Sequence, residues 1–549
     1  MKKVIFLFSV LISSIAFCGW SPTNTIISSN SSDYEQVGAV LDLNHSGYGV
    51  AVWGYRDGGP PAYQVQSSIT TDFGKTWSPA VFIDQANISL SHNTRPRVAL
   101  DESNHAIIVW QRDTGPQYEV RVTPYGENPQ KITVLDAAAG PIYAPRPDIT
   151  MDNMGNALAI WSHEDLSGNH TIKTMLSVDR GINWICQNNL DLNDPSDDET
   201  YPRIAMDKYG NAIATWTYDD GTTDMYTKVA YSSDRGITWS TPIIIDNQVD
   251  KSTYFTFPDI VMDNSGHAII IWVIDVGPAT LTVKTASSND YGKTWSFSVI
   301  DPSNPSFNFI YHPKISMNSS GHAVATWGHH AGGATYYTKV AYSSDWGASW
   351  SNSNIVDPAT SSLYTQPNVK LDDTGRAIVI WNHRSLGNIE IRRADSSDNG
   401  QTWTLGTLAT GLDTTRSSCG ANIFIDKKGN PNALNAIGLW STYISPNSST
   451  QMNHYQEIHL NVSGSQEKAQ GYIQADLRNK LNAEGIGQKG IFKLYKDPGL
   501  TQLIDSTTTD TAISELFEHH VRKGNIYTYY ITWTDEFGYT VGPVQVTVK

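Results

Sequence analysis

The sequence predicts an all-β protein in which a β-propeller of four-stranded blades precedes a C-terminal β-sandwich. Three observations lead to this prediction. The phrase Ser-x-Asp-x-Gly-x-Thr-Trp, or a close variant, occurs at residues 70–77, 177–184, 232–239, 288–295, 343–350 and 396–403. A second phrase, Pro-x-Ile-x-Met-Asp-x-x-Gly-x-Ala followed by an apolar run to a Trp, comes before these copies. The Trp residues that end it are 51 to 57 residues apart, which suits one blade with its loops.

The first phrase has the chemistry of a rigid turn. Its Asp can bond backbone N–H groups of its own turn, its Gly accepts positive φ, and its Trp packs into an apolar layer. The six copies resemble the Asp boxes of the bacterial neuraminidase repeat, which is found in sialidases and in many other β-propellers. The resemblance implies a structural turn between the third and fourth strands of a blade, facing away from the active site. The structural aspartates are then Asp72, Asp179, Asp234, Asp290, Asp345 and Asp398.

The second phrase supplies two strands of each unit. The residues before its Asp alternate as a strand, Asp-x-x-Gly forms a tight hairpin turn, and the run from Ala to Trp is a buried strand. Its copies span residues 96–110, 147–161, 202–216, 258–272, 313–327 and 367–381, with a weaker first copy at 43–53. An eighth copy, at residues 421–440, has no box after it. We expect eight blades, with seven as the alternative if this last copy is not a blade.

The two ends of the repeat region are predicted to close the ring. Residues 20–27 resemble the segments that follow the boxes at Trp77 and Trp239. An N-terminal strand from this region would complete the last blade and remove the open edges of the ring. The unit after Trp110 has only a vestigial box near Tyr125, so we expect its outer turn to be the least regular.

The repeats end near residue 461. Residues 490–497 and 525–533 then alternate in period two, and residues 544–548 form a last apolar run. This region resembles a fibronectin type III sandwich, in which a Tyr-x-Tyr strand precedes the final strand. The predicted domains are a signal peptide at 1–18, an Asp-box β-propeller at 19–461 and a fibronectin type III-like β-sandwich at 462–549.

The N-terminus has the features of a secretory signal. A charged start is followed by a short apolar run from Val4 to Ile12, and the small residues before Phe17 fit a cleavage site. The run is too short to span a membrane as a helix. An alternative is lipidation of Cys18, because residues 15–18 resemble a bacterial lipobox. We therefore expect a secreted or cell-envelope protein, soluble or lipid-anchored, with no transmembrane segment in the mature chain.

Composition disfavours several functions. The formal charge is −16 and no run of Lys and Arg is present, which disfavours nucleic acid as a partner. The sequence has no Cys and His spacing typical of zinc, and its Asp-x-Gly turns lack the full calcium-loop pattern. We predict no metal and no cofactor. The expected partner is a glycan or a protein, and the chain is expected to be a monomer.

If the boxes mark one side of the ring, two sets of loops meet on the opposite side: those after each Trp and those leading into each Pro-x-Ile strand. These loops are rich in aromatic rings, which stack on sugars, and in guanidinium groups, which pair with carboxylates. The candidate ligand-binding residues are Arg56, Arg97, Arg112, Asp148, Tyr201, Arg203, Tyr218, Asp259, Tyr311, Lys314 and Arg384. The opposing interpretation is that Arg and Asp of neighbouring blades neutralise each other and that the aromatic rings cap the core.

Two functions fit these features. The first is a secreted or cell-surface recognition propeller that binds a glycan or protein and has no catalytic residues. The alternative is a sialidase-like exo-glycosidase in which Arg97, Arg203 and Arg112 grip an acidic sugar. The sialidase resemblance also implies a Tyr nucleophile partnered by Glu, and Tyr201 and Glu199 lie on one loop. Against the enzyme, the Phe-Arg-Ile-Pro phrase of sialidases is absent, and sialidase propellers have six blades.

Overall fold

The computed structural model divides the chain into two compact units, residues 1–443 and 444–549. It describes residues 11–16, 19–20, 25–26, 39–56, 63–72, 74, 76–84, 94–115, 117–125, 131–139, 144–165, 170–194, 201–220, 224–245, 252, 256–275, 281–304, 312–331, 335–359, 361, 365–385, 388–412, 421–425, 436–440, 458–467, 470–479, 490–496, 501–509, 514–520, 527–535 and 540–548. Every regular element in these ranges is a β-strand, so the predicted all-β class is confirmed.

In the first unit, seven four-stranded antiparallel sheets follow one another along the described chain. The first sheet contains β4 (Val40–Leu43), β5 (Gly49–Arg56), β6 (Tyr63–Thr70) and β7 (Val81–Phe82). The second contains β8 (Arg97–Leu100), β9 (Ala106–Asp113), β10 (Tyr118–Tyr125) and β11 (Thr133–Ala139). The third contains β12 (Asp148–Met151), β13 (Ala157–Glu164), β14 (His170–Ser177) and β15 (Ile185–Asp194). The fourth contains β16 (Arg203–Met206), β17 (Ala212–Asp219), β18 (Met225–Ser232) and β19 (Ile243–Ile244).

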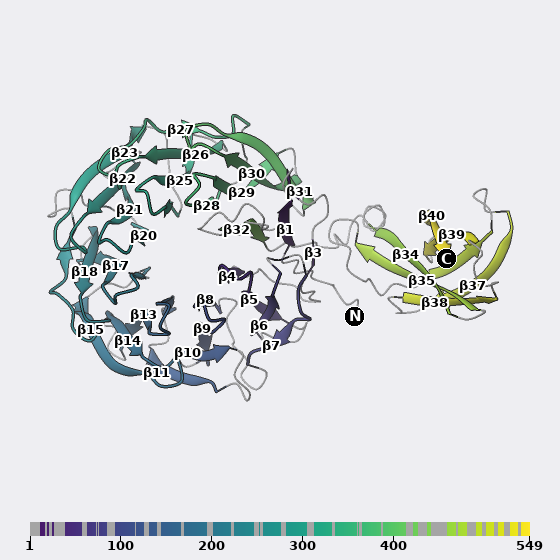
Figure 1. Cartoon of the computed structure of the whole chain (residues 1–549), viewed down its shortest axis with the longest axis horizontal. Coiled ribbons are helices and arrows are strands. Elements are labelled where there is room, and N and C mark those ends of the chain that lie inside the picture. Colours follow the sequence, from purple (N-terminus) through teal and green to yellow (C-terminus); the bar gives the residue numbers. More distant parts are fainter. Residues whose placement is uncertain are drawn as a thin grey trace. The chain divides into compact units, whose positions relative to one another are not determined.

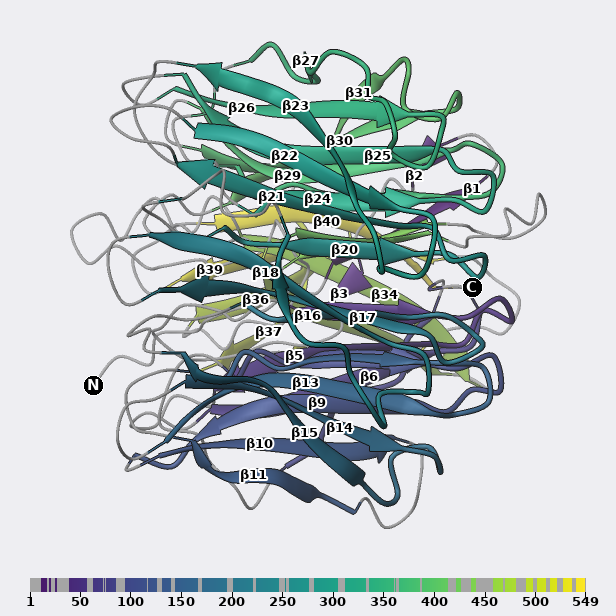
Figure 2. The same ribbon diagram turned by 90° about the vertical axis from the view of Figure 1, so that its left-hand side faces the viewer.

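The fifth sheet contains β20 (Asp259–Met262), β21 (Ala268–Asp275), β22 (Leu281–Ser288) and β23 (Ser296–Asn304). The sixth contains β24 (Lys314–Met317), β25 (Ala323–His330), β26 (Tyr336–Ser343) and β27 (Asn354–Ile355). The seventh contains β28 (Asn368–Leu371), β29 (Ala377–Ser385), β30 (Asn388–Ser396) and β31 (Thr404–Leu412). The first strand of each sheet contacts the first strand of the next, so the seven sheets are blades around one axis (Figure 1). Figure 2, turned by 90°, shows the strands running along that axis.

The eighth sheet combines both ends of this unit. It contains β32 (Ala421–Ile425) and β33 (Ala436–Trp440), followed by β1 (Leu11–Ala16), which pairs with β33. The short strands β2 (Gly19–Trp20) and β3 (Thr25–Ile26) pair with β1 on its other side. Strand β32 contacts both β28 and β4, so the ring closes with eight blades.

The N-terminal closure has one feature that the sequence did not suggest. The outer position of the eighth blade is filled by residues of the predicted segment 20–27, but the third position is filled by β1, which overlaps the apolar run of the predicted signal peptide. Apolar and β-branched residues fit a strand between two neighbours as well as they fit a signal. The signal peptide stays a prediction, which N-terminal sequencing of exported protein would test; Cys18 lies outside the described residues.

All six Asp boxes form the same hydrogen-bonded turn. In the fourth blade, the backbone N–H and hydroxyl of Thr238 donate to the two carboxylate oxygens of Asp234 at 2.9 and 2.6 Å. The Ser232 hydroxyl donates to Asp234 and accepts from the N–H of Gly236, both at 2.8 Å. The equivalent bonds occur at Asp72, Asp179, Asp290, Asp345 and Asp398. The vestigial box after Tyr125 lies outside the described residues.

The box turns and the hairpin turns of the second phrase lie at the same end of the ring. In the fourth blade, the N–H of Arg235 in the box donates to the carbonyl of Gly210 in the hairpin turn at 2.8 Å. The same bond links Arg180 to Gly155, Tyr291 to Gly266, Trp346 to Gly321 and Asn399 to Gly375. The innermost strands therefore begin at the opposite end of the ring.

Neighbouring blades are joined by acidic residues near their outer strands. The Trp at the end of the second phrase is fully buried in each of the seven blades that carry a box or its vestige. In three blades its indole N–H donates to an Asp of the preceding blade: Trp161 to Asp136 at 2.7 Å, Trp216 to Asp191 at 2.9 Å and Trp327 to Asp301 at 3.0 Å. A Lys on the next strand also reaches each of these carboxylates: Lys173, Lys228 and Lys339.

The carboxylate of Asp136 is stabilised in its charged form. Burial alone raises the pKa of Asp136, but hydrogen bonds from His163 and Trp161 and the positive charge of Lys173 outweigh it and lower the pKa to about 2. Asp84 and Asp357 occupy the same position in two other blades and pair with Arg121 at 2.8 Å and Arg392 at 2.6 Å. These contacts fix the spacing between blades, which share no sheet.

The second unit contains two sheets. One has β34 (Ile458–Glu467), β35 (Gln470–Asn479) and β38 (Ser514–His520); the other has β37 (Leu503–Thr509), β36 (Gly490–Tyr495), β39 (Tyr527–Asp535) and β40 (Thr540–Val548). Leu494 and Tyr529 are buried in the second of these sheets. Because β34 pairs with β35 along its whole length, the predicted boundary at residue 461 falls inside a strand of this unit.

Replacing the acid between the second and third blades should destabilise the propeller. For Asp136→Asn we expect the free energy of unfolding to fall by about 1–3 kcal/mol at pH 7, because the neutral amide loses the charge-assisted bonds to Lys173 and His163. The folded-state pKa is depressed, so this stabilisation is present above about pH 4 and is lost as the pH falls to about 2. Urea unfolding at several pH values measures it.

The control for this variant is Glu102→Gln, which neutralises an exposed carboxylate that lies 3.5 Å from His45. An exposed pair of this kind contributes about 0–1 kcal/mol. An Asp136→Asn protein as stable as the control at pH 7 would contradict the role assigned to the inter-blade acid.

Candidate functional site

At the end of the ring opposite the box turns, successive blades present charged residues of alternating sign. They occupy the first position of each innermost strand: Arg97 in β8, Asp148 in β12, Arg203 in β16, Asp259 in β20 and Lys314 in β24. The residue after the phrase Pro holds this position because the strand begins directly behind that Pro. All five are predicted candidates, and the structure brings them together near the axis.

The two acids in this set also hold neighbouring strands. Asp148 lies 3.6 Å from Arg97 and Asp259 lies 3.8 Å from Arg203 and 3.3 Å from Lys314. The other oxygen of Asp148 accepts the backbone N–H of Ile204 in the next blade at 3.3 Å, and the other oxygen of Asp259 accepts the N–H of Ile315 at 3.2 Å. Each acid thus supports the edge of an adjacent innermost strand as well as a cation.

A second ring of side chains lies one step earlier in the chain, at the residue before the phrase Pro. Arg95, Arg146, Tyr201, Phe257 and His312 have φ values of 41, 48, 47, 45 and 46°. Positive φ is unusual for residues with a Cβ, so five repeats of it indicate a backbone shape imposed by the fold.

Hydrogen bonds from the second strand help to hold this shape. The N–H of Gln111 donates to the carbonyl of Thr94, and the N–H of Val273 donates to the carbonyl of Thr256, both at 2.9 Å. The N–H of Arg146 itself donates to the side chain of Gln111 in the preceding blade at 3.1 Å.

The side chains of this second ring contact one another. The Arg146 guanidinium carbon lies 3.7 Å from the centre of the Tyr201 ring. The Tyr201 and Phe257 rings meet edge to face with centres 4.5 Å apart, and the Phe257 and His312 rings are 4.6 Å apart. We call both rings together the axial cluster: Arg95, Arg97, Arg146, Asp148, Tyr201, Arg203, Phe257, Asp259, His312 and Lys314.

The axial cluster concentrates positive charge. The pKa of Arg97 is lowered to about 10 and that of Lys314 to about 8, in both cases mainly by burial and with Arg203 adding to the effect. The pKa of Arg146 falls well below its usual value because of burial and the nearby charge of Arg95. Burial and the charge of Lys314 lower the pKa of His312 to about 3, which leaves its imidazole neutral at physiological pH.

This arrangement can bind an anion. The cluster contains five cationic side chains against two carboxylates, in a chain whose formal charge is −16. Besides burial, the charges of neighbouring cations lower the pKa of Arg95, Arg97, Arg146 and Lys314, and a negatively charged group would relieve this repulsion. Guanidinium groups hold carboxylates and sulfates with two parallel hydrogen bonds, and the rings of Tyr201 and Phe257 offer an apolar surface beside them.

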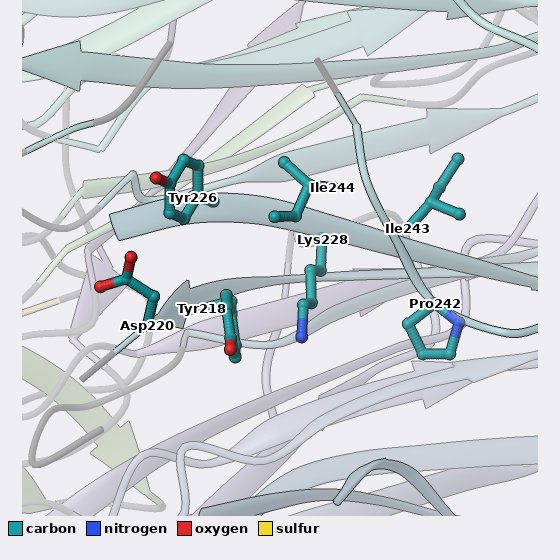
Figure 3. A pocket seen from close by; sticks show the side chains of 7 residues that line it. All are labelled: Tyr218, Asp220, Tyr226, Lys228, Pro242, Ile243 and Ile244. Atoms are coloured by element: carbon teal, nitrogen blue, oxygen red, sulfur yellow. The ribbon is translucent and has the colours of Figure 1, made fainter. Parts of the chain in front are cut away.

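The other predicted candidates lie elsewhere. The Arg112 guanidinium in β9 pairs with Glu119 at 3.2 Å, and the backbone N–H of Arg384 in β29 donates to Ser361 at 3.0 Å. Tyr218 in β17 lies under the Lys228 ammonium and lines a groove of blade 4 (Figure 3). Arg56 ends β5, but its side chain and the whole of Tyr311 lie outside the described residues.

Sequence reasoning missed four members of the axial cluster: Arg95, Arg146, Phe257 and His312. It named Tyr201 alone from the position before the phrase Pro as a site residue. The repeat pattern could have revealed these positions, because the repeats align at this Pro and five consecutive copies have a large side chain just before it. Positive φ was not expected there, since a residue before Pro usually adopts an extended conformation.

Two further features of the described residues bear on the site. None of their groups of His, Cys, Asp and Glu has three members placed to hold a metal ion. None of their elements is a helix with the length and apolar character needed to cross a membrane.

The pKa of Lys314 can be measured directly. We expect reductive ¹³C-methylation of the protein to give one dimethyl-lysine resonance that titrates near pH 8 and is missing in Lys314→Met. Lysines in water titrate near ~10.4. Since the folded-state pKa is lowered, the cluster loses one positive charge as the pH rises through 8, and its affinity for anions should fall over the same range. A Lys314 resonance that titrates with the other lysines would contradict the packed cationic cluster.

Comparison with known proteins supports this architecture. Residues 210–435 match the BNR repeat-like domain. A sialidase from Clostridium perfringens is 26% identical over 203 residues, which cover 30% of this chain and 53% of the sialidase, so the match spans about half the length of that relative.

Solved structures with a similar fold include an ulvan lyase of polysaccharide lyase family PL25 (TM-score 0.42, 11% identity, 70% of this chain and 92% of that chain). They also include the NanB sialidase of Streptococcus pneumoniae (TM-score 0.29, 14% identity, 74% of this chain and 68% of that chain). At these TM-scores the structural likenesses carry no argument about function. The BNR repeats and the sialidase relative show that this chain is similar to sialidase-like β-propellers, and the closed ring of blades agrees with that likeness.

Proposed function

We propose that this protein recognises a glycan through an acidic sugar, which the axial cluster binds by its carboxylate or sulfate. The observation that carries the proposal is the convergence of Arg95, Arg97, Arg146, Arg203 and Lys314 at one end of the ring. The two carboxylates of the cluster, Asp148 and Asp259, contact Arg97, Arg203 and Lys314.

The chemistry of the cluster favours a sugar over a simple anion. Tyr201 is 9% exposed and Phe257 is 5% exposed, so the aromatic rings form a packed floor beside the guanidinium groups. A pyranose with a carboxylate offers both an apolar face for the rings and a charge for the arginines. The sialidase relative and the BNR repeats support a glycan as the ligand class.

The test is a binding measurement with sialyllactose, with a glucuronic acid disaccharide and with lactose as the uncharged reference. We expect the acidic sugars to bind more tightly than lactose, and we expect Arg203→Ala to weaken their binding by about 10- to 100-fold, since a charge-assisted contact contributes about 1.5–3 kcal/mol. Calorimetry at two salt concentrations should show weaker binding at the higher one.

The matched control is Arg180→Ala, which removes a guanidinium of a box turn at the other end of the ring, where Arg180 lies 3.6 Å from Asp101. Its affinity should equal that of the wild type. Equal loss of affinity in both variants, or no preference for acidic sugars in the wild type, would refute the proposed site.

A second candidate function is hydrolysis of a sialoside, and the placement of Tyr201 favours it. Its ring packs against Arg146 within the cluster, and sialidase resemblance implies a Tyr nucleophile among arginines. The Glu199 partner expected from the sequence lies outside the described residues. Release of fluorophore from a sialoside, lost in Tyr201→Phe while sialyllactose still binds, would establish the enzyme. Binding without release in the wild type would leave recognition as the function.

We further propose that the second unit is a fibronectin type III-like module that acts as a spacer, and that the chain is exported and works as a monomer outside the cytoplasm. The order of its strands in sheets of three and four supports the module, and the charged and apolar start of the chain supports export. Limited proteolysis followed by sialyllactose binding to the released propeller would separate the two units, and the spacer role fails if binding needs the second unit.

A further inference from the structure

Blade 4 contains a groove that is separate from the axial cluster by its residues and its charge. It has a volume of about 600 Å³ and is lined by Tyr218, Asp220, Tyr226, Lys228, Pro242, Ile243 and Ile244 (Figure 3). These residues come from β17, β18 and β19 and the segments next to them. Small-molecule sites typically have volumes of about 300–1,000 Å³, so the groove is large enough for a sugar unit.

The groove is associated with a very short outer strand. β19 has two residues and pairs with β18 only at Lys228 and Val229, whereas the outer strand of the preceding blade, β15, has ten residues. Pro242, directly before β19, has no N–H to donate and cannot extend the pairing. Toward Tyr226 the outer contacts of β18 are single ones: the N–H of Ile245 donates to the carbonyl of Thr227 at 2.9 Å, and Ser252 forms an isolated bridge with Met225.

The charged side chains of the groove already interact with other groups of the protein. The Lys228 ammonium lies 3.2 Å from the centre of the Tyr218 ring and 2.9 Å from a carboxylate oxygen of Asp191 in the neighbouring blade. Asp191 thus neutralises Lys228, and Asp220 adds a further negative charge to the lining. An anionic ligand, which the axial cluster suits, would be repelled from this groove.

Apart from Lys228, the lining of the groove has two chemically different sides. Pro242, Ile243 and Ile244 form an apolar wall, and Ile243 is 48% exposed to solvent. On the other side, Tyr218 and Tyr226 lie directly opposite each other across β17 and β18, with Asp220 beyond them. Phenol hydroxyls and a carboxylate can exchange hydrogen bonds with several ligand hydroxyls.

We propose that this groove binds an uncharged pyranose unit of a glycan. A pyranose has apolar C–H faces that fit the Pro242 and Ile243 wall and hydroxyls around its edge that fit Tyr218 and Asp220. No group in the lining offers a positive charge free of a carboxylate, so an uncharged sugar fits better than an acidic one. The protein would then contact a glycan at two chemically distinct places.

The experiment is saturation-transfer difference NMR of the full-length protein with lactose, cellobiose and mannobiose, each at millimolar concentration. We expect at least one disaccharide to show ring-proton signals, and we expect Tyr218→Ala to weaken its binding by about three- to tenfold. Ile243→Asp serves as a second variant, because it changes an exposed wall residue without disturbing the core and should weaken binding by a similar factor.

The control is Tyr209→Ala, which removes a 60% exposed ring from a hairpin turn at the box end of the ring and should leave the signals unchanged. Arg203→Ala should also leave them unchanged, which separates this groove from the axial cluster. The proposal is overturned if no disaccharide gives a signal with the wild type, if both groove variants bind like the wild type, or if Arg203→Ala abolishes the signals.

Discussion

The propeller depends on the buried acids that five of its blades offer to the next. Blades share no backbone ladder, so side chains must set the distance and tilt between them. In three places one carboxylate accepts an indole N–H and a Lys ammonium from the neighbouring blade, and in two places it accepts an Arg. A buried Trp alone could pack at several angles, whereas a fixed hydrogen bond at its nitrogen selects one.

The spacing that these buried acids set between blades also determines the geometry of the axial cluster. Five blades contribute two residues each to it, so the distance between Arg97 and Arg203, for example, is a distance between blades. Asp148 and Asp259 each bond a cation of a neighbouring blade and the edge of a neighbouring innermost strand. Their negative charge is committed to the framework and to the cations beside them.

The repeats made the fold predictable, because a turn that closes on its own Asp needs no information from distant residues. The contribution of β1 was not predictable, since an apolar run has the same composition in a signal peptide and in a strand.

For the site, the positions after the phrase Pro were found from the sequence. Arg95, Arg146 and His312 were missed because the direction of their side chains follows from positive φ, which the letters do not encode. Arg112 and Arg384 were chosen from loop position; Arg112 pairs with Glu119 of the adjacent strand, and the backbone N–H of Arg384 donates to Ser361.

The residues before the phrase Pro share one backbone conformation although they include Arg, Tyr, Phe and His. The conformation therefore belongs to the blade and not to the side chain it displays. One blade can exchange this residue while its neighbours keep theirs, so the preference for a ligand can drift one substitution at a time without refolding the scaffold. The side chains before the phrase Pro can therefore vary on a constant backbone, and related chains with the same blades could bind quite different molecules.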